Sequence, residues 1–455
     1  IKRSFQDNEL YKATLRHYIG YLMEKRFPMN WAFEGTRSRM GKLMPPRYGL
    51  LKYVLEACHA TDARNIHIIP ISISYDLIRD VEEYATEQTG RGKGAESLRW
   101  FIGYIRSLAR PMGKVYMDIG EPVVLERAPD PDDRLALSKI AFEVAVEANH
   151  VTPITFPSLV TMSLLGSAPK ALTEAEVIED LRALLAWAEA RNLRISDDFD
   201  RAYADQMEGL LGIMIAERIV TRYDEGPEIV YGIDLNQHPV ASYYRNTVIH
   251  FFVNKAIIEL ALLKASEKEG EGALEVFWNE VDELRDLFKF EFFYAPTEEF
   301  HRQIREELDR YDTDWENLLS QGAAGFGLML NAMTPLVSHV TLLTYAEAYS
   351  VVASLLARLD NTQSLEEDSC VEQALKFGRQ AYLQRRISSE SSIGKQLFKN
   401  AYKMMQSRKL TDCSDPDVAE NRIDLARQIR DLLRRIDLIR AIGVASRGSA
   451  QETSA

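Results

Sequence analysis

The sequence predicts an α/β domain followed by a larger, mostly helical domain. Up to about residue 125, apolar runs typical of strands alternate with segments of helical spacing, as in layered α/β structures. Two prolines among charged residues at 126–134 indicate a surface loop or a boundary. Beyond about residue 152, nearly every segment has helical periodicity. We therefore expect an αβ domain at 1–134, a helical domain at 135–445 and a disordered tail at 446–455, where the residues are small and polar.

The elements expected in the first domain follow one another closely. The spacing predicts helices at residues 11–25, 48–60 and 98–108, and strands at 31–33, 66–75 and 114–119. The first helix ends where Phe27 and Pro28 break its pattern, and the second strand is rich in isoleucine. Gly35 allows the backbone to turn directly after Glu34.

The second domain is expected to consist almost entirely of helices. Thr173 followed by Glu176 is a capping box that predicts the start of a long helix. Residues 317–346 carry no charge and are long enough for a membrane span of about 20 residues, but three glycines and Pro335 favour a buried helix pair. The apolar run at 248–263 is more typical of a core helix than of a membrane anchor. Further helices are expected at residues 243–264, 273–288, 297–310, 337–359, 371–383 and 417–442.

The distribution of charge excludes some functions. A net charge of −13 argues against a general nucleic-acid-binding protein, which needs a basic surface to displace counterions from phosphates. Residues 1–60 nevertheless hold eleven lysines and arginines against five acidic residues, a net +6, which leaves −19 for the remainder. Such a basic segment either faces an anion or forms a solvated charged surface. Three scattered cysteines without a C-x-x-C pair indicate neither a disulfide framework nor a zinc site.

The run from Glu34 to Arg39 is the best candidate for the anion site. Arg37 and Arg39 flank Ser38, and a guanidinium group matches phosphate oxygens in a bidentate way that an ammonium group cannot. Glu34 would hold an arginine in place or accept a hydrogen bond from a substrate hydroxyl. Nearby cations that could join them are Lys2, Arg3 and Lys42. A surface loop with a salt bridge would have the same composition, so composition alone leaves both interpretations open.

The literal string Glu-Gly-Thr-Arg-Ser-Arg resembles the third motif of the glycerolipid acyltransferases. It is most similar to the glycerol-3-phosphate acyltransferases of the bacterial membrane type, where the block is F-x-E-G-x-R-S-R-x-G. Ala32 replaces the phenylalanine of that block, and Gly41 keeps its last glycine. The first residues, Ile-Lys-Arg, resemble the end of the second motif, Ile-Arg-Arg, with Lys2 in place of one arginine.

Other segments extend the resemblance. Residues 68–75 resemble the fourth motif, an apolar strand that carries a proline, here Pro70. A proline within a strand is confined to edges, starts or bulges, where a ligand can approach, although an ordinary edge strand would also fit. The turn at 119–122 resembles the Gly-Glu-Pro turn of the family, and residues 243–246 resemble a stretch of its helical half.

The resemblance implies transfer of a fatty acyl group from an acyl thioester to the sn-1 hydroxyl of glycerol 3-phosphate. The donor would be acyl-CoA or acyl carrier protein, no metal or prosthetic group would be needed, and the protein would sit peripherally on the cytoplasmic side of the cell membrane. The implied acceptor site consists of Glu34, Gly35, Arg37, Ser38 and Arg39, with charge from Lys2 and Arg3 and a pocket shaped by Pro70.

The catalytic base of the family is a histidine in an H-x-x-x-x-D motif, whose aspartate orients the ring. None of the eight histidines here has an aspartate five positions on. His301 with Glu306 comes nearest, and we interpret that pair as a solvated helix face. We therefore expect the histidine and aspartate to lie upstream of Ile1 and these residues alone to be inactive. Alternatives are a dihydroxyacetone-phosphate or lysophosphatidate acyltransferase, or a non-catalytic relative that binds phosphate lipids.

Overall fold

The computed structural model describes residues 8–35, 38–88, 113–197, 199, 207–268, 272–413 and 415–454. The chain is mostly helical with small sheets, and it divides into two compact units. Unit 1 is drawn from Ile1–Ser38, Leu43–Ser74 and Val115–Pro153. Unit 2 is drawn from Arg39–Lys42, Tyr75–Lys114 and Ile154–Ala455. The expected helix at 98–108 lies outside the described residues.

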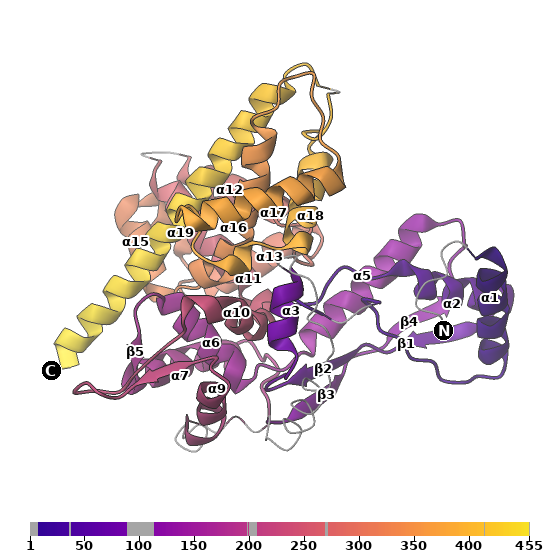
Figure 1. The fold of residues 1–455 in the computed structure, drawn as a ribbon, viewed down its shortest axis with the longest axis horizontal. Helices are drawn as coiled ribbons and strands as arrows, with labels where there is room; N and C mark the ends of the chain where they lie inside the picture. Colours follow the sequence, from indigo (N-terminus) through magenta and orange to yellow (C-terminus); the bar gives the residue numbers. More distant parts are fainter. Residues whose placement is uncertain are drawn as a thin grey trace. The chain divides into compact units, whose positions relative to one another are not determined.

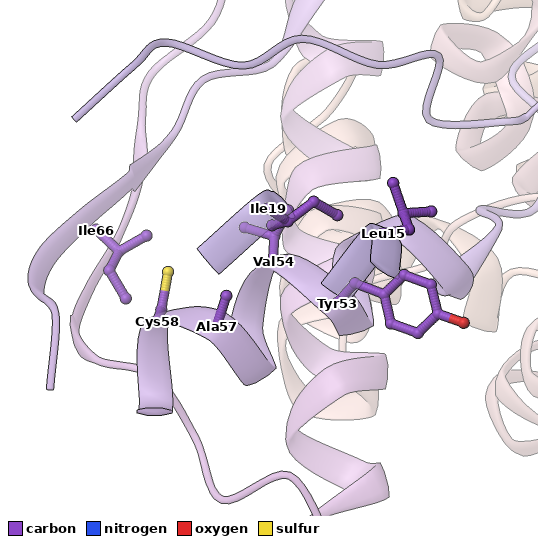
Figure 2. Close-up of a cluster of buried hydrophobic side chains, with 7 residues drawn as sticks. All are labelled: Leu15, Ile19, Tyr53, Val54, Ala57, Cys58 and Ile66. Carbon is purple, nitrogen blue, oxygen red and sulfur yellow. The ribbon is translucent and has the colours of Figure 1, made fainter. Parts of the chain in front are cut away.

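Unit 1 is a small αβ assembly around apolar side chains. Helices α1 and α2 pack against each other, and the cluster in Figure 2 joins Leu15 and Ile19 of α1 to Val54 and Cys58 of α2 and to Ile66 of β1. A second cluster joins α2 to α5 and β1. The elements are α1 (Glu9–Glu24), α2 (Tyr48–Ala60), β1 (Arg64–Ile68), β2 (Ile71–Tyr75), β3 (Val115–Ile119), β4 (Val123–Arg127) and α5 (Arg134–His150).

Two expectations about the strands of this unit are wrong in detail. The strand expected at 66–75 is interrupted at Ile69 and Pro70, because proline has no N–H to donate to a ladder. β1 then pairs with β4 in antiparallel fashion, while β2 pairs with β3 in a separate two-stranded sheet. The strand expected at 31–33 is a turn, in which Gly35 N donates to Ala32 O at 3.0 Å.

Unit 2 is a helical body with one three-stranded sheet. α19, the yellow helix in Figure 1, packs along α16, which also contacts α11, α17 and α18. The body contains α3 (Val81–Gln88), α6 (Phe156–Ser167), β5 (Leu172–Thr173), α7 (Glu174–Glu189), α9 (Gly212–Ala216), β6 (Thr221–Tyr223), β7 (Val230–Gly232), α10 (His238–Asn246), α11 (Ile249–Ser266), α12 (Ala273–Leu287), α13 (Thr297–Asp309), α14 (Trp315–Ser320), α15 (Ala323–Ala332), α16 (Ser338–Leu356), α17 (Glu367–Leu383), α18 (Lys395–Ser407) and α19 (Val418–Ser454).

Most expected helices of this body are confirmed. The capping box is present, since Thr173 Oγ1 accepts from Glu176 N and Thr173 N donates to Glu176 Oε2. The helix expected at 243–264 is divided into α10 and α11, and α11 is a core helix. No described helix is both long and apolar enough to cross a bilayer. α19 includes most of the segment expected as a tail, and the domain boundaries at 134 and 445 stay predictions.

Candidate functional site

The structure describes five of the residues predicted for the site, namely Glu34, Gly35, Ser38, Arg39 and Pro70. Lys2, Arg3 and Arg37 lie outside the described residues. The motif is shared between the units, because Glu34, Gly35 and Ser38 belong to unit 1 and Arg39 belongs to unit 2. The predicted residues in unit 1 and those in unit 2 therefore form two separate parts of the candidate site.

The turn at Gly35 requires glycine. Gly35 has φ +69°, a left-handed conformation, and a Cβ placed there would lie 2.9 Å from Cγ of Arg47. The N–H of Arg47 in turn donates to Phe33 O at 3.0 Å, which ties the turn to the start of α2. Sequence reasoning did not single out Arg47, and its contact with Gly35 adds a cation beside this loop.

Glu34 provides the carboxyl group of the predicted site, and the pKa of this group is shifted. Its side chain is half-buried, and Oε2 is buried without a hydrogen-bond partner among the described residues. Burial raises the pKa of Glu34 to about 7, although the backbone N–H of Met44 bonds to the carboxylate and opposes the shift. A carboxyl group that titrates near neutral pH is a typical feature of binding and catalytic sites.

Arg39 lies at a small cavity of unit 2 whose lining is mostly apolar. Its Nε is 2.5 Å from Oε2 of Glu87 on α3, and its side chain is 45% exposed, so the guanidinium has donors free for a ligand. The cavity, of about 40 Å³, is also lined by Ser242 and Asn246 of α10 and by Thr344 of α16. These hydroxyl and amide groups offer neutral hydrogen bonds beside Arg39. The carboxylate of Glu390, which pairs with Arg379, also lines the cavity.

Lys42 does not join the cations of the site. It is 4% exposed, and its Nζ lies 2.5 Å from Oε2 of Glu291 and 2.6 Å from the Glu291 carbonyl oxygen. Burial lowers the pKa of Lys42 and raises the pKa of Glu291, because the low-dielectric interior penalises both charges. The expectation that Lys42 could contact a ligand is wrong, because its ammonium group is used inside unit 2.

Pro70 lies at the break between the two small sheets of unit 1. It is buried, and its carbonyl oxygen accepts from Gly120 N at 2.9 Å. Glu121 N donates to Oε1 of Glu147 on α5 at 2.8 Å. The two segments that resemble the fourth motif and the Gly-Glu-Pro turn are therefore adjacent. Whether Pro70 shapes a substrate pocket stays a prediction.

His301 and Glu306 of α13 have ordinary structural roles. His301 Nε2 lies 2.8 Å from Oδ1 of Asp282 on α12, and Glu306 pairs at 2.6 Å with Arg302 of its own helix. Glu306 is 52% exposed. Glu306 fits the interpretation of a solvated helix face, whereas His301 is only 23% exposed and packs against Trp278 of α12. Within the described residues no group of histidines, cysteines and carboxylates is arranged to hold a metal ion.

A carboxyl group of near-neutral pKa lies at a glycine turn, and a half-exposed arginine lies at a small cavity. These features make the protein a candidate binder of small phosphorylated or otherwise anionic molecules. Comparisons with known proteins identify the family. Residues 84–414 match the family described as the glycerol-3-phosphate acyltransferase C-terminal region. The chain belongs to this family.

Individual relatives agree with the family assignment. Proteins named "Putative acyltransferase plsB1" from Mycobacterium bovis and Mycobacterium tuberculosis are each 33% identical over 448 residues, which cover 96% of this chain and 72% of the relative. A glycerol-3-phosphate acyltransferase of Actinobacillus succinogenes is 26% identical over 330 residues, which cover 68% of this chain and 39% of that protein. The chain is thus a relative of the glycerol-3-phosphate acyltransferases, and the family implies glycerol 3-phosphate and an acyl donor as substrates.

Proposed function

We propose that this chain carries the acceptor-binding part of a glycerol-3-phosphate 1-O-acyltransferase, which catalyses the first step of phospholipid synthesis. The observation that carries the proposal is the loop of Glu34 to Arg39. In this short stretch occur a buried carboxyl oxygen, which has no hydrogen-bond partner among the described residues, and a half-exposed arginine at a small cavity. Membership of the family supports the same chemistry.

Each group would have a distinct task. The guanidinium of Arg39, with Arg37, Lys2 and Arg3, would neutralise the phosphate. Glu34 would accept a hydrogen bond from a glycerol hydroxyl. A histidine of an H-x-x-x-x-D motif, provided by sequence outside these 455 residues, would take the sn-1 hydroxyl proton as the oxygen attacks the thioester carbonyl. The new ester forms as the thiol of coenzyme A or acyl carrier protein leaves, so the thioester supplies the activation.

Binding of glycerol 3-phosphate to the 455-residue chain tests the acceptor site. Arg39→Ala should weaken binding, measured by titration calorimetry, by about tenfold or more, because a charge-assisted hydrogen bond contributes about 1.5–3 kcal/mol. Arg222→Ala is a matched control, since Arg222 is also a half-exposed arginine with one carboxylate partner, Asp224 at 2.6 Å. Equal effects of the two substitutions, or no binding by the unsubstituted chain, would contradict the assignment.

Kinetics separate the rival acceptors and the non-catalytic alternative. In a protein that joins this chain to an H-x-x-x-x-D motif, Arg37→Ala should raise KM for glycerol 3-phosphate far more than KM for the acyl donor. Competition among glycerol 3-phosphate, dihydroxyacetone phosphate and lysophosphatidate identifies the acceptor, since all three offer a phosphate to the same arginines. Robust acylation by the 455 residues alone would contradict our placement of the base, and binding without acylation in the joined protein would favour a phosphate-lipid binder.

A peripheral location on the cytoplasmic side of the membrane is part of the same proposal, because the product of the reaction is a lipid. Apolar and basic surface would provide the attachment. Exposed apolar side chains support this mode, among them Ile73 and Met117, at 52% and 65% exposure. Sedimentation with vesicles of anionic lipid should carry the protein down, and high salt should weaken the effect.

A further inference from the structure

The segment that follows the last arginine of the motif is held tightly by unit 2. Met40 is 8% exposed and Lys42 is 4% exposed, whereas the side chain of Arg39 is 45% exposed. An exposed arginine is thus attached to a short stretch of buried backbone. Three separate contacts fix this stretch, and each uses a different kind of interaction.

The first contact is made by Asn246 at the end of α10. Its Nδ2 donates to Met40 O at 2.8 Å, and its Oδ1 accepts from Nη2 of Arg245 at 2.8 Å and from Nε at 3.1 Å. Arg245 is 4% exposed and also donates to Thr344 Oγ1 at 3.4 Å, with no carboxylate partner among the described residues. Burial lowers the pKa of Arg245 to about 10. The amide of Asn246 is thereby bonded at both ends and fixed in orientation.

The second contact is between two backbones. Gly41 has φ +80°, and a Cβ placed there would lie 1.9 Å from Tyr243 O on α10. Any other residue would meet both backbone strain and a direct collision with a helix carbonyl. The backbone of Gly41 therefore lies closer to α10 than a side chain would permit.

The third contact encloses the ammonium group of Lys42. Besides its two bonds to Glu291, Lys42 Nζ lies 4.9 Å from the centre of the Phe292 ring and 4.8 Å from that of Tyr345. Hydrogen bonds and ring faces on several sides hold the lysine in one position. Asn246 at Met40 and Glu291 at Lys42 thus fix the chain at two points just beyond Arg39.

We infer that the helical unit positions the phosphate-binding arginine of the acyltransferase motif through a clamp formed by Asn246, Gly41 and the Lys42–Glu291 pair. A guanidinium binds a phosphate well only if its backbone is already in place, because ordering it on binding would reduce the affinity. Asn246 also lines the cavity at Arg39, so one side chain links the clamp to the space for a ligand. Asn246, Arg245, Lys42 and Glu291 are positioning residues in this scheme. The part that concerns phosphate rests on the function proposed above.

Hydrogen exchange tests the clamp without any ligand. In the 455-residue chain, Asn246→Ala should speed the exchange of backbone amides in residues 39–43 about tenfold or more, and Gly41→Ala should do the same. The matched controls are Asn254→Ala, which removes an amide bonded to Gln303 on another helix, and Gly322→Ala, which places a Cβ at φ +74° with nothing within 4 Å. Unchanged exchange in both clamp variants, or equal changes in the controls, would overturn the inference.

Substrate kinetics separate positioning from a merely structural role. The kinetics use the protein that joins this chain to an H-x-x-x-x-D motif. There Asn246→Asp retains an acceptor for Arg245 but cannot donate to Met40 O. It should preserve the fold while it raises KM for glycerol 3-phosphate about tenfold, with KM for the acyl donor unchanged. A loss of kcat with unchanged KM values would indicate only less folded enzyme and would refute positioning. If the unsubstituted chain does not bind glycerol 3-phosphate, the proposed function fails, and the exchange measurement still decides whether the clamp exists.

Discussion

Strands β2 and β3 expose most of their apolar side chains, whereas the helices of unit 2 bury theirs. β2 and β3 leave five of them exposed, at 49–67%, a set that we call the ribbon face: Ile71, Ile73, Val115, Met117 and Ile119. The alternate positions, Ser72 and Asp118 among them, are less exposed. In α16, by contrast, nearly every side chain from Ser338 to Leu356 is buried. In β2 and β3 the apolar side chains are thus the exposed ones, whereas a sheet usually has polar side chains on its outer surface.

The two units also differ in what they bury. The cluster of Figure 2 in unit 1 contains no charged residue and consists of aliphatic side chains, Tyr53 and Cys58. Unit 2 encloses two lysine–glutamate pairs, Lys42 with Glu291 at 2.5 Å and Lys255 with Glu259 at 3.0 Å. Buried charges require well-made partners, and their removal exposes the cost of desolvation. The interior of the helical unit therefore contains charged pairs with defined partners. One of these pairs, Lys42 with Glu291, holds the last residues of the motif.

Loss of one charge from the Lys42 pair should have the largest effect. Lys42→Met leaves Glu291 buried without its cation, which should lower the free energy of unfolding by about 3–5 kcal/mol in urea denaturation. The double variant Lys42→Met/Glu291→Gln should recover most of this loss, because it removes both charges and keeps an acceptor for Tyr349. Lys12→Met is the control, since Lys12 forms an equally short but exposed pair with Glu9 and should change stability by at most about 1 kcal/mol.

A small effect of Lys42→Met would remove the contrast between the units. It would mean that water reaches Glu291 in solution, and the clamp on the motif would lose its third contact. A double variant no more stable than Lys42→Met would show that the pair is needed for its geometry rather than for its charge balance.

An intermediate effect is expected from Glu34, the half-buried acid of unit 1. Its pKa is raised to about 7 in the folded chain, so the folded state binds a proton more tightly than the unfolded state. The contribution to stability is therefore full below pH 4.5 and is lost as the pH rises to about 7. The loss should be on the order of 3 kcal/mol. Glu34→Gln should remove this pH dependence, so the variant should gain stability over the unsubstituted chain at pH 8 but not at pH 4.5.

The difference between the two proteins, measured by urea denaturation at several pH values, isolates Glu34 from the other carboxyl groups. A difference that is constant from pH 4.5 to 8 would show that Glu34 is solvated and has an ordinary pKa. The same substitution should weaken binding of glycerol 3-phosphate, which would indicate that the acid is retained for its function at the expense of stability.

Local patterns predicted the helices well, because helical spacing and capping depend on nearby residues. The capping box at Thr173 and the core helix α11 are examples. A break in the strand at Pro70 could be predicted, since proline cannot donate a hydrogen bond within a ladder. The separate pairing of β2 with β3 could not be predicted. Lys42 was misjudged because its partner, Glu291, is 249 residues away in the chain. The role of Asn246 was hidden for the same reason, although a polar pair within a mostly apolar helical region was visible in the sequence.

The smallest effect is expected on the ribbon face. Met117→Lys places a charge at a position that is 65% exposed, so the free energy of unfolding should change by no more than about 0.5 kcal/mol. Met404→Lys in α18 is the matched control, because Met404 is fully buried and an ammonium group placed there would lose its hydration. If Met117→Lys proves costly in the isolated chain, the ribbon face is covered in solution, and the contrast between the units is smaller than the exposed fractions indicate. If it is neutral for folding but prevents sedimentation with anionic vesicles, the exposed apolar side chains of unit 1 serve membrane attachment, while those of unit 2 serve only packing.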